Sequence, residues 1–263
     1  NAAKIGIDPF LVIQLTHSGR YSKPEGVARP KVAGINPVLD ITSPYVLTDD
    51  DLKRIMDSFV EAARLAYRSG FNAVDLKACH GYLLVDILSA RTRVNSIFGG
   101  EDTESRFRFI LETFDRIRDE VPGIMVTTRL NISDVYKGGF GVDENGQPDF
   151  TEPLLLVDHL KSRGVSLINI TMGSPYFNSH VNRPFDNPLP GQDVPDEHPL
   201  EGVMRMINGT SLFSTRYPEI AVAASAYSYL RHYAPNVAAG VINTGGASLI
   251  GFGRNSFAYP SMP

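Results

Sequence analysis

The chain has 263 residues, of which 43% are hydrophobic and 21% charged, and its formal net charge at pH 7 is −4. This balance is ordinary for a globular protein and excludes the basic footprint of a nucleic-acid-binding protein. No apolar run reaches the ~18 residues of a membrane span and none resembles a signal peptide, so we expect a cytoplasmic protein that does not enter a membrane. The single cysteine, Cys79, excludes an internal disulfide and a four-cysteine metal or iron–sulfur site, and no metal site is predicted.

The first quarter of the chain predicts a strand, a long loop and a helix. "LVIQL" (11–15) follows Pro9 and precedes a polar turn, which favours a buried strand. Residues 23–47 are rich in Pro and Gly and are expected to form a loop with a small hairpin. A helix should follow from Thr48, which can cap its first turn, to Gly70, which can end it.

The remaining residues continue the alternation of short apolar runs and amphipathic stretches. Strands are predicted at 71–77, 124–130, 166–171, 220–225 and 248–253, and helices at 104–120, 152–164 and around 228–241. Residues 173–215 are rich in Pro, Asn and His, and such a long connection predicts a functional lid or a partly disordered loop. Gly245 and Gly246 are expected to form a turn before the last strand.

The alternation of strands and helices defines the fold class. Such strands pair in parallel through right-handed crossovers, and their continuous apolar character indicates cover on both faces. The length is close to the ~250 residues of a TIM (β/α)8 barrel. The sequence therefore predicts an α/β fold of this type with about six βα units, two short of a closed barrel.

Polar side chains follow every one of the six predicted strands. In a barrel, the active site is built where strands end and the following loops begin, so these residues are candidates. They are Gln14, His17 and Arg20, then Lys77, His80 and Tyr82, then Arg129, then 172–174, then Ser225, and last Gly253 and Arg254.

Five segments resemble successive signatures of one family. They are "VIQLTHSGR", "GFNAVDLKACHGYLL", "FGGEDTESRFRF", "TTRLNISD" and "LIGFGRNSFAYP", in this order between Pro9 and Pro260. They resemble the Old Yellow Enzyme family of FMN-dependent NAD(P)H oxidoreductases, and the block around "HGYLL" is the most specific. The resemblance implies one domain over 1–263, a TIM barrel that binds FMN across its mouth. It also implies that the family's first two βα units are missing and that the domain is incomplete at its N-terminus, with its C-terminal end open to the same question.

The resemblance assigns the flavin-binding residues. Gln14 is expected to hydrogen-bond the polar edge of the flavin ring, because an amide offers a donor and an acceptor side by side; the alternative is a glutamine that ties a loop to its strand. Arg129 is expected near the pyrimidine end, where a cation stabilises the charge of the reduced ring. The phosphate is expected on the backbone amides of Ser225, Ala226, Gly253 and Arg254.

The resemblance also assigns the catalytic residues. His80 should hydrogen-bond a substrate carbonyl oxygen, and Tyr82 should give a proton to the substrate α-carbon. Lys77 stands where the family has a first histidine. We expect either that Lys77 favours substrates with an anionic group near the alkene, or that it pairs with a carboxylate from the missing βα units and touches no substrate.

Other residues have structural expectations. Cys79 should pack behind its strand, and His17 either supports the flavin or bonds only to backbone. In "FGGEDTESRFRF", Gly99 and Gly100 should form a turn while Glu104 and Arg106 hold the next helix. Three residues of the long loop are candidates to close over a ligand: His180, Arg183 and His198.

The expected reaction takes hydride from NADH or NADPH through FMN to a small molecule with an activated alkene, an α,β-unsaturated carbonyl or enoate. Two alternatives stay open. A lysine at a barrel strand end beside a tyrosine also suits a Schiff-base lyase of the class I aldolase type, with Lys77 as nucleophile. A catalytically inactive flavin-binding barrel is the other. The sequence also allows a homo-oligomer.

Overall fold

The computed structural model describes residues 6–39, 41–188, 190–191, 193–253 and 255–258. The chain forms two compact units. The first comprises Asn1–Asn36, Asp40–Ala78 and Tyr82–Thr128, and the second comprises Pro37–Leu39, Cys79–Gly81 and Arg129–Pro263. No helix in these described ranges is long and apolar enough to cross a bilayer.

The sheet of the first unit has the strand order β1-β4-β5. Strand β1 (Val12–Leu15) pairs in parallel with β4 (Ala73–Ala78), and β5 (Met125–Asn131) begins in this unit. Strand β4 is almost wholly buried, as predicted for a strand covered on both faces, although Asp75 and Lys77 interrupt its apolar residues. The prediction that β1 is buried was wrong: its side chains are exposed or half-buried, because it is the edge strand of this order and has a paired strand on one side only.

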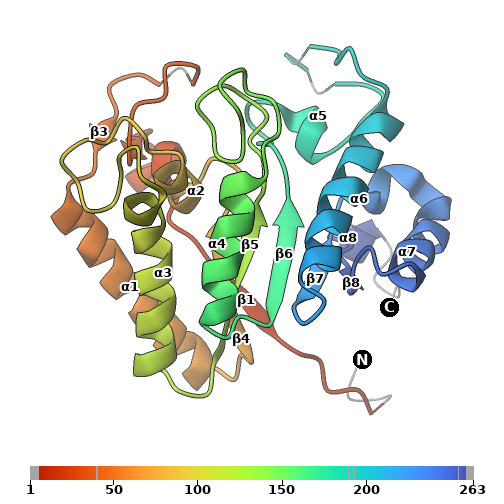
Figure 1. Cartoon of the computed structure of the whole chain (residues 1–263), viewed down its shortest axis with the longest axis horizontal. Helices are drawn as coiled ribbons and strands as arrows, with labels where there is room; N and C mark the ends of the chain where they lie inside the picture. The colour runs from red at the N-terminus through yellow and green to blue at the C-terminus, as the bar shows by residue number, and fades with distance from the viewer. Residues whose placement is uncertain (1–5, 40, 189, 192, 254, 259–263) are drawn as a thin grey trace. The chain divides into compact units, whose positions relative to one another are not determined.

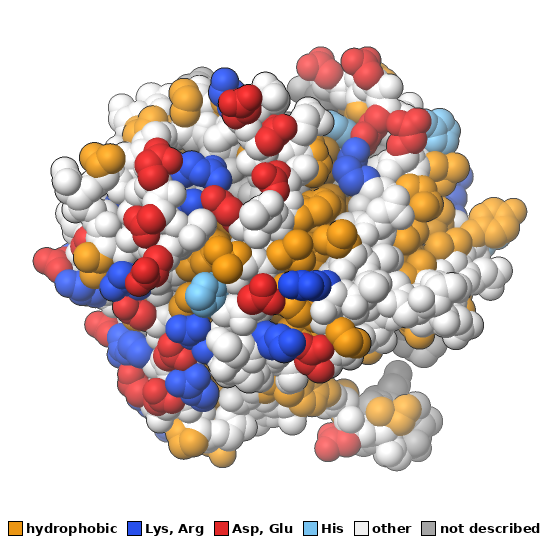
Figure 2. Space-filling model, in the orientation of Figure 1, with side chains coloured by type: hydrophobic (Ala, Val, Ile, Leu, Met, Phe, Trp, Pro, Cys, Tyr) orange, Lys and Arg blue, Asp and Glu red, His pale blue; other side chains and the backbone are white. Residues whose placement is uncertain are grey.

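Two long helices pack side by side in the first unit (Figure 1). Helix α1 (Asp49–Arg68) begins at Thr48, whose hydroxyl accepts the N–H of Asp51 in a capping box, as predicted for this cap. Helix α3 (Thr103–Glu120) contacts α1 through an edge-to-face pair of Phe59 and Phe109, whose ring centroids are 6.5 Å apart. Charged side chains gather over the outer faces of these helices (Figure 2), where Arg116 donates to Asp57 across the pair.

Arg106 and Glu104 differ in their roles at the start of α3. Arg106 is 1% exposed and donates to the carbonyls of Gly100, Leu88 and Glu101, so its predicted role in holding this helix is confirmed. Glu104 was predicted to do the same, but its side chain is 88% exposed and forms a long ion pair with Arg108, 3.6 Å between the charged atoms. The helix is capped instead by Asp102, which accepts the N–H of Ser105.

The shorter elements of the first unit were predicted least well. Helix α2 (Leu83–Leu88) is fully buried, and its six residues, apolar except for Asp86, are too few to show a helical period. Strands β2 (Lys31–Val32) and β3 (Tyr45–Val46) pair in parallel, so the predicted hairpin was wrong. Single turns of 3-10 helix stand at η2 (Gly19–Tyr21) and η3 (Pro24–Gly26).

The second unit contains the end of β5 and three further strands in the order β5-β6-β7-β8. Strand β6 (Leu167–Thr171) pairs in parallel with β7 (Ala221–Ala224), which pairs in parallel with β8 (Leu249–Ile250). Its helical elements are α4 (Thr151–Ser162), α5 (Ser179–Asn182), α6 (Pro199–Arg216), η4 (Tyr227–Tyr233), α7 (Ala234–Asn243) and α8 (Asn255–Ala258).

Helix α6 overturns the prediction that 173–215 is a long loop. It packs beside β7 (Figure 1) and buries Val203, Met206 and Phe213. Its two glycines conceal it in the sequence, because glycine disfavours helices. The structure explains one of them: a Cβ at Gly209 would overlap the methyl of Met172, so close packing excludes any larger residue. The helix predicted around 228–241 begins as α7 only at Ala234, after a non-helical Arg231.

Candidate functional site

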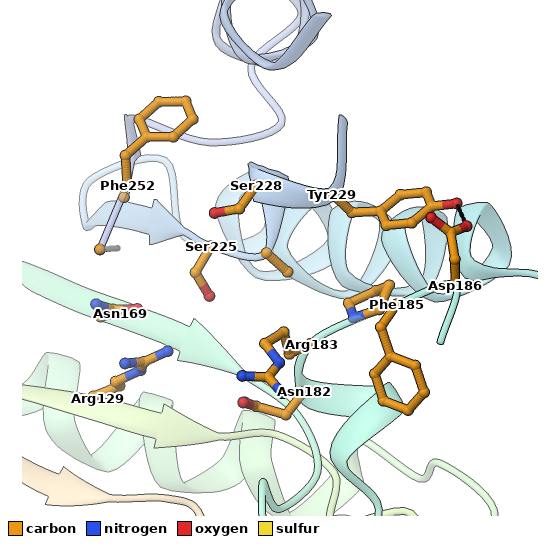
Figure 3. A pocket seen from close by; sticks show the side chains of 14 residues that line it. Arg129, Asn169, Asn182, Arg183, Phe185, Asp186, Ser225, Ser228, Tyr229 and Phe252 are labelled. Atoms are coloured by element: carbon orange, nitrogen blue, oxygen red, sulfur yellow. Dashed lines mark hydrogen bonds between the residues drawn. The ribbon is translucent and has the colours of Figure 1, made fainter. Parts of the chain in front are cut away.

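A cavity of about 720 Å³ lies in the second unit where four strands end (Figure 3). Its size is in the range of pockets that hold small molecules and cofactors. It is lined by Arg129 of β5, Asn169 of β6, the residues after β7 and β8, and the loop that follows α5: Arg129, Asn169, Asn182, Arg183, Pro184, Phe185, Asp186, Ser225, Ala226, Ser228, Tyr229, Gly251, Phe252 and Gly253.

Four of the predicted cofactor-binding residues meet at this cavity. They are Arg129, Ser225, Ala226 and Gly253. The backbone turns sharply after β7, where Ala226 has a left-handed φ of 77°. This turn brings its peptide groups to the cavity wall. Arg254 was predicted beside them and lies outside the described residues. That these residues hold a cofactor stays a prediction.

Asn169 is a cavity residue that the sequence analysis missed. Its side chain lies beside Arg129 on the neighbouring strand (Figure 3). Its Oδ1 is buried and accepts no hydrogen bond from any residue that the structure describes. The signal was present in "LINIT", because Ile168 and Ile170 are fully buried and alternation turns Asn169 to the opposite face. A buried carbonyl without a donor costs about 1–3 kcal/mol, so a ligand with an N–H or O–H group would bind here favourably.

His80 belongs to the second unit and is joined to the cavity through Asn182. His80 is 8% exposed, and its Nε2 lies 2.9 Å from Nδ2 of Asn182 and 3.4 Å from Oγ1 of Thr171. Asn182 ends α5 and lines the cavity (Figure 3). The backbone of His80 has a φ of 62°, and that of Gly81 has a φ of 71°. This left-handed turn sets the position of the His80 Cβ, from which the imidazole projects.

Lys77 and Tyr82 lie together in the first unit. Lys77 is near the end of β4, and its Nζ stands 3.4 Å from the ring centroid of Tyr82, the residue that precedes α2. A cation over an aromatic face is attracted by the ring quadrupole. Neither of the two roles predicted for Lys77 included this contact. Both roles stay predictions. Gln14 is exposed on β1, and its predicted role stays untested.

The loop after β1 is held by protein contacts. Arg20 forms a salt bridge with Asp86 of α2, both of them buried. Nδ1 of His17 accepts the N–H of Gly19 at 3.1 Å, and burial with the nearby Lys31 lowers the pKa of His17. Of its two predicted roles, the backbone contact of His17 is therefore present. Cys79 is fully buried, as predicted.

Comparison with known proteins places this architecture in a family. The family model described as NADH:flavin oxidoreductase / NADH oxidase matches residues 7–182. The chain belongs to this family. The resemblance to Old Yellow Enzyme stated from the five sequence segments is thereby confirmed.

Relatives of this family member cover most of its length at low identity. It is 32% identical to an NADPH dehydrogenase of Clostridium acetobutylicum over 172 residues, 63% of this chain and 50% of that protein. The chain spans about half the length of the curated relatives it matches.

Solved structures that are similar to this one include two with the same TM-score. One is morphinone reductase in complex with tetrahydroNAD, with a TM-score of 0.63 at 20% identity, covering 96% of this chain and 64% of that one. The other is an Old Yellow Enzyme homologue from Zymomonas mobilis, with a TM-score of 0.63 at 19% identity, covering 99% of this chain and 67% of that one. These matches confirm the predicted TIM-barrel fold class.

In this NADH:flavin oxidoreductase family member, part of the predicted lid lines the cavity. Asp186 accepts a hydrogen bond from the Tyr229 hydroxyl at 2.5 Å and one from Arg231 at 3.2 Å, which joins the loop after α5 to η4 (Figure 3). The hydrogen bond to Asp186 raises the pKa of Tyr229. Of the three lid candidates, Arg183 lines the cavity, while His180 does not and His198 caps α6.

Proposed function

We propose that this chain is the flavin-binding part of an NAD(P)H-dependent oxidoreductase and that its cavity holds FMN. The observation that supports this most is that the Asn169 carbonyl oxygen, which is buried and accepts no hydrogen bond from any described residue, lies on the strand next to the Arg129 guanidinium at the same cavity. The pyrimidine edge of a flavin places an N–H donor between two carbonyl acceptors. An acceptor and a cation side by side are the complementary groups.

The rest of the cavity suits the remainder of FMN. The hydroxyls of Ser225 and Ser228 can hydrogen-bond a ribityl chain, and Arg183 adds a second positive charge near the mouth. The turn at Ala226 and the backbone at Gly253 can present peptide N–H groups to a phosphate. The predicted groups at these positions are thus of the kinds that FMN requires, and Gln14 stays a further candidate.

When bound, FMN would supply the acceptor and donor of hydride between NAD(P)H and a second substrate. The chain's own residues would polarise and protonate that substrate. We propose that His80 donates a hydrogen bond to the carbonyl oxygen of an activated alkene, while Tyr82 transfers its phenolic proton to the α-carbon. The balance is one hydride to the β-carbon, one proton to the α-carbon, and oxidation of NAD(P)H.

The test is the visible absorption of the purified protein, before and after anaerobic NADH or NADPH. A flavin band that bleaches with either nucleotide and returns with an enone is the expected result. An Arg129→Met variant should bind FMN more weakly, whereas Arg118→Met, at an exposed site on α3, should not. A protein that stays colourless with added FMN would refute the proposal. A bleached flavin that no enone reoxidises would refute an activated alkene as the second substrate.

The aldolase-type alternative is not favoured by the geometry. A Schiff-base lysine must react as the neutral amine, and the position of the Lys77 Nζ over the Tyr82 ring stabilises the ammonium form instead. Borohydride reduction in the presence of an aldehyde or ketone substrate would add its mass to Lys77 only if that alternative held.

A further inference from the structure

We propose that Asn182 is a positioning residue that holds His80 as a neutral imidazole with its proton on Nδ1. Its catalytic meaning rests on the proposed function, in which His80 polarises a substrate carbonyl. The consequence is that any hydrogen bond from His80 to a substrate comes from Nδ1, because Nε2 is the acceptor of the Asn182 amide.

The orientation of the Asn182 amide follows from its neighbours. Its Nδ2 lies 2.9 Å from His80 Nε2, 3.1 Å from Thr171 Oγ1 and 3.3 Å from the carbonyl oxygen of Met172. A backbone carbonyl can only accept. Were the amide rotated by 180°, its own oxygen would face the Met172 oxygen, and two acceptors would oppose each other. The NH2 group therefore faces this cluster.

The protonation state of His80 follows from that orientation. An amide N–H directed at Nε2 needs the lone pair of that nitrogen, which exists only in neutral imidazole with the proton on Nδ1. An Nε2–H or an imidazolium would place two donors face to face at 2.9 Å. The Thr171 hydroxyl, 3.4 Å from Nε2, can rotate to accept or donate and does not alter this choice.

The local backbone makes the arrangement specific. His80 has a left-handed φ directly after the buried Cys79, and the residue is itself only 8% exposed, so few ring positions are open to it. Asn182 ends α5, and the Nδ2 bond to Met172 ties it to the segment after β6. The link joins residues 102 apart in the chain, and both belong to the second unit.

The test is nitrogen NMR of the full chain labelled with 15N-histidine, with His80 assigned by the signals lost in His80→Gln. In the parent protein at pH 8, His80 should show a protonated Nδ1 and an unprotonated Nε2. In Asn182→Leu the proton should shift toward Nε2. In Asn182→Asp the carboxylate should accept from Nε2–H, and the imidazolium should persist to higher pH. Asn208→Leu, at an exposed position of α6, should leave the His80 signals unchanged.

Two results would overturn the proposal: a proton on Nε2 in the parent protein, or a tautomer that Asn182→Leu does not change. This readout needs neither FMN nor substrate, so its failure is separate from failure of the spectral test of function. Where both hold, Asn182→Leu should lower kcat/KM for an enone by about 2–12-fold, the equivalent of one hydrogen bond. Its pH profile should differ from that of the parent, which a purely structural role would not produce.

Discussion

Removal of the cation from the buried Arg20–Asp86 pair should destabilise the fold strongly. The two side chains are 7% and 4% exposed, and the second oxygen of Asp86 accepts the N–H of Ala33 at 2.8 Å. Arg20→Met keeps most of the apolar stem and leaves the carboxylate buried without its partner. Breaking a buried pair on one side costs about 3–5 kcal/mol, which for a chain of this size lowers Tm by roughly 6–20 °C.

The loss should depend on pH in a defined direction. Burial raises the pKa of Asp86, and Arg20 opposes that rise. Without Arg20, the folded-state pKa moves further above the unfolded value of ~3.9. A group with a raised folded-state pKa contributes stability below the unfolded value and loses it as pH rises through the folded one. The deficit of the variant should therefore grow between pH 4 and pH 8.

Urea unfolding at pH 5 and pH 8, followed by circular dichroism because the chain has no tryptophan, measures this. The matched control is Arg54→Met: Arg54 donates to Asp51 at 2.5 Å but is 71% exposed, so under about 1 kcal/mol should be lost. Arg20→Met combined with Asp86→Leu should recover only part of the stability, because it removes the unpaired carboxylate but takes the acceptor from the buried N–H of Ala33. The reasoning is refuted if Arg20→Met costs no more than the control at pH 8, or if the double variant is no better than the single one.

Four further changes test the cavity, Lys77 and the backbone. Asn169→Leu keeps the branched side-chain shape but removes the acceptor, so FMN should bind about 2–12-fold more weakly in a fluorescence titration; an unchanged Kd would contradict the ring contact. Lys77→Gln should lower kcat/KM for enoates relative to neutral enones, and an equal ratio in both proteins would remove Lys77 from substrate selection. Gly141→Ala should lower the free energy of unfolding by about 2–5 kcal/mol, because its φ is 66° and a Cβ would overlap the Ile132 carbonyl. Gly240→Ala in α7, where a Cβ meets nothing within 4 Å, should raise it by about 0.5–1 kcal/mol; a similar sign for both glycines would be inconsistent with this reading.

The elements predicted correctly are those with strong local signals. Helix α1 has a capping residue, an acidic first turn and a terminal glycine, and β4 is mostly apolar, with Asp75 and Lys77 as its polar residues. Helix α6 was missed because its stability comes from tertiary packing around Gly209 and not from helix propensity. The exposure of β1 was missed because the residues of a strand do not indicate its position in the order of the sheet.

The candidate site likewise contains residues that the sequence predicted and residues that it did not. Arg129 and Ser225 could be proposed because polar residues at parallel strand ends converge, and both line the cavity. Asn169 was overlooked as one amide inside an apolar strand. The bond between Asn182 and His80 could not be found, because no pattern in one sequence pairs residues in a strand-end turn and a short distant helix.

Ala226 makes the cavity wall a place where binding can be altered without loss of stability. Most substitutions in a ligand pocket remove packing or hydrogen bonds and weaken the fold. Here a methyl group stands on a backbone with a φ of 77°, a conformation that costs a non-glycine residue about 1–2 kcal/mol. Glycine would release that strain, and its greater freedom in the unfolded chain would offset part of the gain. Ala226→Gly therefore widens the cavity at little or no cost to the fold, which makes it a starting point for engineering this protein toward bulkier ligands.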